Sequence, residues 1–139
     1  MIDRFNIRVY GILVQDNKIL LSEEEYKGRH LVKFPGGGLE YGEGLLEALI
    51  RECQEELNCR VEVGELYFVT DYFIQSAFIE TDQIISFYYL ISTEDKITES
   101  SAEHKIVWID PDPNQSNYLT FPQDRDVFVE VCSMISNGN

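Results

Sequence analysis

Residues 36–59, with the sequence GGGLEYGEGLLEALIRECQEELNC, decide how this chain folds. The stretch begins as a glycine-rich loop. From Leu45 to Leu57 it contains no helix breaker and consists mostly of good helix formers, so a helix is predicted there. At about 100° per residue, three acids near the end of this helix fall within an arc of about 100°. These acids are Glu52, Glu55 and Glu56.

The predicted helix also has an apolar stripe, which we expect to face the core. Its members are Leu46, Leu49, Ile50, Cys53 and Leu57. Like charges three and four residues apart cost a few tenths of a kcal/mol per pair in an isolated helix, and a bound cation would offset that cost. Clustered carboxylates are hard oxygen ligands, which suit Mg²⁺ or Mn²⁺.

The spacing of these residues resembles the signature sequence of the Nudix hydrolases, the MutT-like enzymes that act on nucleoside diphosphate-X compounds. The family pattern has glycine, five residues, glutamate, seven residues, Arg-Glu, an apolar residue, any residue and Glu-Glu, and it ends in any residue, glycine and an apolar residue. The matching positions here are Gly37, Glu43, Arg51, Glu52, Cys53, Glu55, Glu56, Asn58 and Cys59. We call residues 37–59 the signature box.

The chain departs from the pattern at two positions of the signature box. Asn58 replaces the usual glycine, and asparagine is the next-best residue for a left-handed helix cap. Cys59 replaces an aliphatic residue. Neither change affects the acids. The resemblance implies a single Nudix domain over residues 1–139, with an α/β/α sandwich around a mixed central sheet.

The order of hydrophobic and polar segments is consistent with that fold. We expect strands at residues 5–14, 18–21, 31–34, 60–73, 83–92 and 105–109, with a second helix starting near residues 120–122. Gly11 is a candidate bulge in the first strand. Residues 22–30 are interpreted as a mobile polar loop, and residues 73–82 and 93–103 as loops. Asp124 suits the N-terminal dipole of the second helix.

Composition excludes several classes of protein. The chain is 44% hydrophobic and 26% charged, which is typical of a globular domain rather than a disordered one. Its net charge of -14 argues against a nucleic-acid polymer as partner. There is no apolar run of membrane-spanning length and no signal peptide, so we expect a cytoplasmic protein without a membrane partner. Cys53, Cys59 and Cys132 are interpreted as reduced, mostly buried thiols.

The charge is distributed unevenly along the chain. Residues 1–35 contain six lysines and arginines and five acids, whereas the remainder contains five basic and twenty acidic residues. Basic contacts to an anionic substrate are therefore expected in the first part, with Arg8, Arg29 and Lys33 as candidates. Tyr72 is a candidate for stacking on a nucleobase, with core packing as the alternative.

The resemblance implies hydrolysis of a phosphoanhydride by metal-activated water. The implied ligands of Mg²⁺ or Mn²⁺ are Glu52, Glu55, Glu56 and the carbonyl of Gly37. Glu43 and Arg51 are expected to form an ion pair that joins the loop to the helix. The general base is Glu52 or, as in some family members, an acid of a later loop, here preferably Glu103. Glu52, Glu55 and Glu103 are thus the predicted catalytic residues.

Other features of the sequence leave alternatives open. His30 and His104 are interpreted as surface residues rather than catalysts. Extra motifs of the hydrolases of ADP-ribose, NADH and coenzyme A are not found, so a nucleoside triphosphate or a nucleotide sugar remains as the small-molecule substrate. The alternative function is a Nudix-fold nucleotide-binding or regulatory module with weak or no turnover. Homodimers are common among such small domains, and no pattern in the chain decides between monomer and dimer.

Overall fold

The computed structural model describes residues 1–138 and shows a mixed sheet with helices on both sides. The strands are β1 (Arg4–Gln15), β2 (Lys18–Tyr26), β3 (Arg29–Lys33), β4 (Gly36–Gly38), β5 (Glu62–Val69), β6 (Asp82–Ser92) and β7 (His104–Ile109). The helices are α1 (Leu45–Leu57), the 3₁₀ helix η1 (Pro113–Tyr118) and α2 (Pro122–Ser136). No helix of residues 1–138 is long and apolar enough to cross a membrane.

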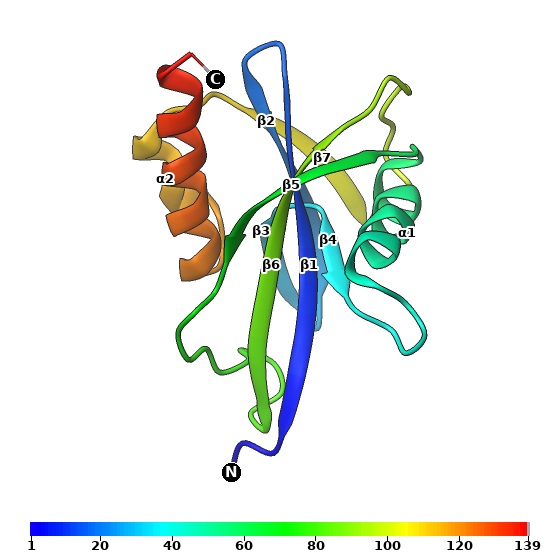
Figure 1. Cartoon of the computed structure of the whole chain (residues 1–139), viewed down its shortest axis with the longest axis vertical. Helices are drawn as coiled ribbons and strands as arrows, with labels where there is room; N and C mark the ends of the chain where they lie inside the picture. The colour runs from blue at the N-terminus through cyan, green and yellow to red at the C-terminus, as the bar shows by residue number, and fades with distance from the viewer. Residues whose placement is uncertain (139) are drawn as a thin grey trace.

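The sheet has the order β3-β2-β1-β6-β5, with β4 attached to β1 and β7 attached to β2. β1 runs parallel to β6 from Arg4↔Asp82 to Leu13↔Ile91, and the other pairings are antiparallel. α1 and α2 lie on opposite sides of the strands (Figure 1). The mixed sheet between helices that the sequence predicts is therefore confirmed.

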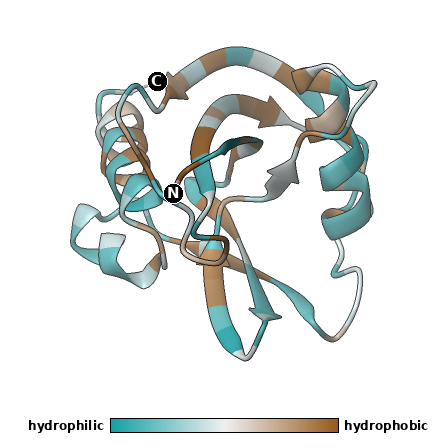
Figure 2. Ribbon diagram, turned by 90° about the horizontal axis from the view of Figure 1, so that it is seen from below, coloured by the Kyte–Doolittle hydropathy of each residue, from teal (hydrophilic) through white to brown (hydrophobic). Residues whose placement is uncertain are grey.

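Two hydrophobic cores follow from the alternation of side chains along β1. Val9 and Leu13 pack in the core that α1 covers, whereas Tyr10 and Ile12 pack in the core that α2 covers. Because both faces are buried, β1 lacks the polar alternation of a half-exposed strand. In Figure 2 the hydrophobic colour follows the strands between the two helices.

The prediction of a mobile loop at residues 22–30 is wrong. β2 continues to Tyr26, and a tight turn with Lys27 at φ 50° and Gly28 at φ 76° leads directly into β3. This turn geometry joins the two strands of a hairpin. The polar residues that indicated a loop pair across the hairpin instead, as His30 does with Glu25 at 2.6 Å.

Smaller corrections concern single residues and ends of elements. Gly11 is not a bulge, because its pairing with β6 is regular; a Cβ there would lie 2.4 Å from the Ile91 side chain, so close packing requires the glycine. Leu46 is exposed, and Glu56 is buried in its helix instead. β5 is shorter than the predicted strand 60–73 and its pairing is interrupted between Val63 and Phe68. The predicted helix cap at Asn58 is left-handed, with φ 54°.

Candidate active site

The glycines of β4 place the loop of the signature box against α1. Gly36 adopts φ 145°, and a Cβ at this position would lie 2.1 Å from the carbonyl oxygen of Val9. A Cβ on Gly37 would lie 2.4 Å from Oε2 of Glu52. The sequence predicted a glycine loop but not its pairing with β1 as a strand. Gly36 is needed for close approach to β1, and a Cβ on Gly37 would displace the carboxylate of Glu52.

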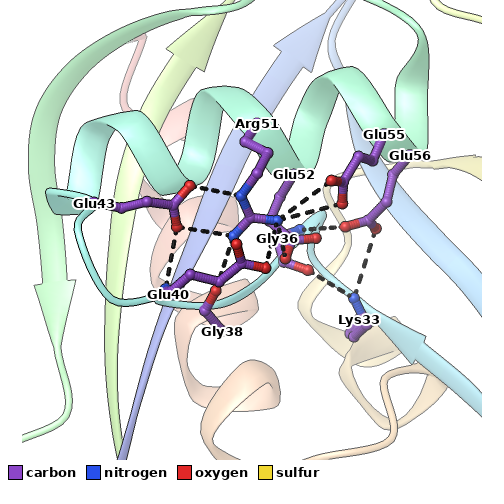
Figure 3. Close-up of polar contacts among 9 residues, drawn as sticks. All are labelled: Lys33, Gly36, Gly38, Glu40, Glu43, Arg51, Glu52, Glu55 and Glu56. Carbon is purple, nitrogen blue, oxygen red and sulfur yellow. Dashed lines mark hydrogen bonds and ion pairs between the residues drawn. The ribbon is translucent and has the colours of Figure 1, made fainter.

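Arg51 joins the loop to the helix through several contacts of its guanidinium group (Figure 3). Its Nε donates to Glu43 Oε2 at 2.6 Å, and its Nη2 donates to Glu43 Oε1 at 3.0 Å and to the carbonyl oxygen of Gly38 at 3.1 Å. Its Nη1 donates to Glu52 at 3.2 Å and to Glu55 at 3.3 Å. A bidentate pair of this kind fixes orientation as well as distance. The expected ion pair between Glu43 and Arg51 is therefore present.

The three acids of the signature box line one cavity of about 210 Å³ together with residues 36–38. Their exposures differ, since the side chain of Glu55 is 59% exposed and that of Glu56 only 7%. Burial, followed by the charge of Glu56, raises the pKa of Glu52 above its ordinary value. Because the charge of Glu56 disfavours the ionised form of Glu52, positive charge is stabilised between the two side chains.

Basic and polar groups occupy the buried end of this acid cluster. Glu56 accepts hydrogen bonds from the backbone N–H of Gly36 at 3.2 Å and from Ser22 Oγ at 3.3 Å. Lys33 Nζ lies 3.6 Å from Glu56 Oε1 and 3.6 Å from Glu24 Oε1. Burial is the largest single influence and acts to lower the pKa of Lys33, but Glu56, Tyr10 and Glu24 together outweigh it and the pKa is raised. Glu56 is thus oriented from three directions.

The donor chemistry of the cavity fits a divalent cation. Its acidic residues and the backbone of Gly37 offer oxygen ligands only, as Mg²⁺ and Mn²⁺ prefer. Among residues 1–138, however, no three histidine, cysteine, aspartate or glutamate side chains converge as a set of metal ligands. Glu55 contacts Arg51 instead, and its exposed side chain is free to turn toward the cavity. Glu52, Glu55, Glu56 and the Gly37 carbonyl are the groups that would hold the ion.

A second, larger cavity of about 510 Å³ adjoins the first. Both cavities are lined by Arg8, Glu24, Tyr26 and Lys33, so they share a wall; we call the two together the active-site depression. The wall of the larger one is rich in aromatic rings, namely Tyr10, Tyr26, Tyr72, Phe73, Phe78 and Phe121. The combination of an acidic end, a basic middle and an aromatic end matches a ligand with phosphates and a flat ring.

The predicted substrate contacts occupy different places. Arg8 lies between the cavities, where its Nε donates to Tyr10 Oη at 2.6 Å, and Lys33 lies beside it. Tyr72 lines the larger cavity and is half-exposed. Arg29 lines neither; its guanidinium carbon lies 4.9 Å from the centre of the Phe78 ring, and Phe78 lines the larger cavity.

Glu103, the candidate general base in the loop before β7, lies outside the cavity of the three glutamates. Glu103 lines neither cavity, and its backbone N–H is held by Ser101 Oγ at 3.2 Å. The next residue, His104, lines the smaller cavity and contacts Glu24 at 2.7 Å. Sequence reasoning missed both His104 and Glu24. The signal that could have found them is the pairing of β2 with β7, which depends on residues 80 positions apart.

Asp124 is a further residue whose place differs from the prediction. It is 2% exposed, borders the larger cavity and accepts a hydrogen bond from Tyr88 Oη at 2.5 Å. Burial raises its pKa to about 6. The expected benefit at the α2 dipole is therefore secondary to a buried contact with β6.

Comparisons with a family model and with solved structures agree with the resemblance seen in the sequence. The family model described as NUDIX domain matches residues 4–131. A solved structure of the E. coli ORF135 protein is 22% identical, with a TM-score of 0.78 over 97% of this chain and 94% of that one. A MutT protein from Methanosarcina mazei is 18% identical, with a TM-score of 0.75 over 100% and 99%. A MutT NUDIX hydrolase from Burkholderia pseudomallei is 20% identical, with a TM-score of 0.73 over 93% and 99%. No curated protein sequence matches the chain.

Proposed function

The chain belongs to the NUDIX family of hydrolases, which cleave pyrophosphate bonds, and on that premise we propose that it hydrolyses a nucleoside diphosphate-X compound with Mg²⁺. The X group is a phosphate, as in a nucleoside triphosphate, or a sugar. One observation supports this most strongly: the cavity of the three glutamates adjoins the aromatic cavity, and both are lined by Arg8 and Lys33.

Each part of the depression suits one part of such a substrate. Arg8 and Lys33 would contact the phosphate oxygens, and Tyr72 would stack against the nucleobase at the aromatic end. Arg29 would support that end indirectly through Phe78. The scissile anhydride would then lie between the basic middle and the acids of α1.

The acids would act on the reacting end of the substrate. Glu52, Glu55, Glu56 and the Gly37 carbonyl would hold Mg²⁺, which would neutralise phosphate charge and lower the pKa of a bound water. With a net charge of -14 on the chain, such neutralisation is needed before a polyanion can bind. Glu52, or Glu103 from the loop, is the carboxylate predicted to remove a proton. Arg51 and Glu43 would keep the loop and the helix in register.

Phosphate or pyrophosphate release from a panel of nucleoside triphosphates and nucleotide sugars tests this proposal. The parent is compared with Glu55→Gln, which keeps the shape of the side chain and removes its charge. Glu62→Gln on the exposed edge strand β5 is the matched control. We expect turnover that requires Mg²⁺ and that falls about a hundredfold in Glu55→Gln only.

Two outcomes would contradict the proposal. Equal rates in the parent and Glu55→Gln would show that the acids of the signature box do not take part in catalysis. Binding of a nucleotide without turnover anywhere on the panel would favour the alternative, a nucleotide-binding or regulatory module on the same fold.

A further inference from the structure

We propose that His104, oriented by Glu24, accepts the proton of the attacking water in this reaction, in place of Glu52 or Glu103, the carboxylates that the sequence predicts for this role. The inference rests on the proposed function and names a residue that the signature box does not contain. It arises from strand pairing: β2 and β7 are antiparallel neighbours with Glu24 opposite His104. The two side chains meet with His104 Nε2 2.7 Å from Glu24 Oε2.

The contact decides which ring nitrogen is free. The other oxygen of Glu24 lies 3.6 Å from the ammonium group of Lys33, so the Glu24 carboxylate forms an ion pair on that side and accepts a hydrogen bond from His104 on the other. The proton between His104 and Glu24 is therefore on Nε2 of the imidazole. Nδ1 of the neutral ring keeps its lone pair, and among residues 1–138 it has no hydrogen-bond partner.

The position of the ring suits proton transfer. His104 lines the same cavity as the three glutamates, and its side chain is 36% exposed, so water can reach it. Glu24 lines this cavity as well. Glu103, the acid predicted from the sequence, is adjacent in the chain but lines neither cavity. A carboxylate that holds the far nitrogen fixes the tautomer and stabilises the imidazolium that forms.

The second histidine of the chain shows what is particular about His104. His30 also contacts glutamates, but both of its nitrogens are engaged, Nδ1 with Glu25 at 2.6 Å and Nε2 with Glu23 at 3.1 Å. Its side chain is 57% exposed, and it lines neither cavity. His30 therefore has the same kind of partners but no free ring nitrogen and no place in either cavity.

The proton-transfer step balances as follows. The water oxygen forms a bond to phosphorus while one of its O–H protons passes to Nδ1 of His104. The bond from phosphorus to the bridging oxygen breaks, and its electron pair stays on that oxygen. The imidazolium, stabilised by Glu24, then returns the proton to solvent when the products leave.

Several charged groups surround the pair and set its response to pH. Glu24 and Lys33 approach it from β2 and β3. The remaining charged residues near it are Glu23 and Lys105, paired across β2 and β7, Glu103 before it, and Glu52, Glu55 and Glu56 around the cavity. Both signs of charge face the imidazole, so the pH profile has to be measured on matched variants.

The experiment compares His104→Gln with His30→Gln on the nucleotide that the parent hydrolyses best. Glutamine at position 104 can still donate to Glu24 but cannot accept a proton from water. We expect kcat of His104→Gln to fall about a hundredfold with little change in KM, as for loss of a general base. The acidic limb of the kcat profile should vanish in this variant and remain in the parent and in His30→Gln. In His104→Ala, added imidazole should restore part of the rate, and thermal unfolding verifies that each variant is folded.

The result that would overturn the role of His104 differs from the result that would overturn the proposed function. If the parent turns over and His104→Gln keeps its rate within threefold, or keeps the acidic limb, the role of His104 is overturned while the proposed function stands. If the parent hydrolyses nothing on the panel, the proposed function fails and the proton-transfer step fails with it.

Discussion

The two ends of the active-site depression are built by different means. The acidic end comes from one continuous stretch, the signature box, in which a loop and the helix after it face each other. The aromatic end collects residues from β1, β2, the segment after β5 and the start of α2. We call these the box end and the aromatic end. The acids proposed to hold the metal are thus encoded locally, whereas the aromatic wall and the His104–Glu24 pair depend on the pairing of distant strands.

The largest effect is expected at the box end. Glu52→Gln should lower kcat about a thousandfold, because it removes one charged oxygen ligand from the reacting region. The same change should raise the thermal stability of the protein in EDTA, since Glu52 is disfavoured by burial and by the charge of Glu56. Activity and unfolding temperature are measured on the same sample. A variant that keeps a tenth of the parent rate would remove Glu52 from the catalytic set.

The aromatic end contains a buried carboxylate, Asp124, whose ionisation should lower the free energy of unfolding. The Asp124 carboxyl has an unfolded value of 3.8 and a folded pKa of about 6, so the native state binds the proton more tightly. Its stability contribution is therefore present at low pH and is lost as the pH rises from about 4 through 6. Asp124→Asn should raise the free energy of unfolding at pH 7 by roughly 3 kcal/mol, because the amide stays neutral.

Urea denaturation between pH 4 and pH 8 measures this effect, and the difference between Asp124→Asn and the parent should shrink toward pH 4. Asp126→Asn, on an exposed residue of the same helix turn, is the matched control. A difference that is the same at every pH would show that packing, and not charge, sets the stability at this position.

A smaller effect on activity is expected when the contact between Arg51 and Glu43, which joins the loop of the box end to α1, is weakened. Lysine cannot form the bidentate contact that Arg51 makes with Glu43 at 2.6 and 3.0 Å. Arg51→Lys should lower kcat/KM roughly 10- to 100-fold, as is usual for groups that orient metal ligands. The Mg²⁺ concentration that gives half-maximal rate should rise too. Arg60→Lys, outside both cavities, is the control, and an equal loss in it would point to a general effect of charge.

The smallest effect is expected for the half-exposed ring of the aromatic end. Tyr72→Ala should raise KM about fivefold with kcat within twofold of the parent, because one stacking contact contributes about 1 kcal/mol. Tyr41→Ala removes a fully exposed ring outside both cavities and should leave KM unchanged. A fall in kcat of Tyr72→Ala without a change in KM would mean that the ring positions the reacting groups.

The difference between the two ends also explains what the sequence predicts. Spacing within the signature box is a local property, so α1 and its left-handed cap at Asn58 follow from the residues between 36 and 59. Strand pairing is not local, so nothing in the sequence places Glu24 opposite His104. The polar residues 22–30 resemble a loop because their partners lie across the hairpin and on β7.

The burial of single residues also depends on contacts between segments that are distant in the sequence. Periodicity places Leu46 in the apolar stripe and Glu56 in the arc of acids, but in the structure Leu46 is exposed and Glu56 is buried. Glu56 is buried because Lys33, Ser22 and the backbone of Gly36 provide partners for its oxygens. Asp124 is buried because Tyr88 reaches it from β6. Such pairs decide which acids leave the surface, and they are known only when the strands are in place.

The parallel pairing of β1 with β6 also governs the order in which the chain can fold. Arg4 contacts Asp82, a residue 78 positions later, so β1 leaves the ribosome long before its partner is made. Until then only the hairpin with β2 offers local hydrogen bonds to its last residues, Val14 and Gln15. Non-local pairing of this kind slows folding and leaves apolar segments open to aggregation. The N-terminal strand is therefore the segment for which we expect the nascent protein to need a chaperone.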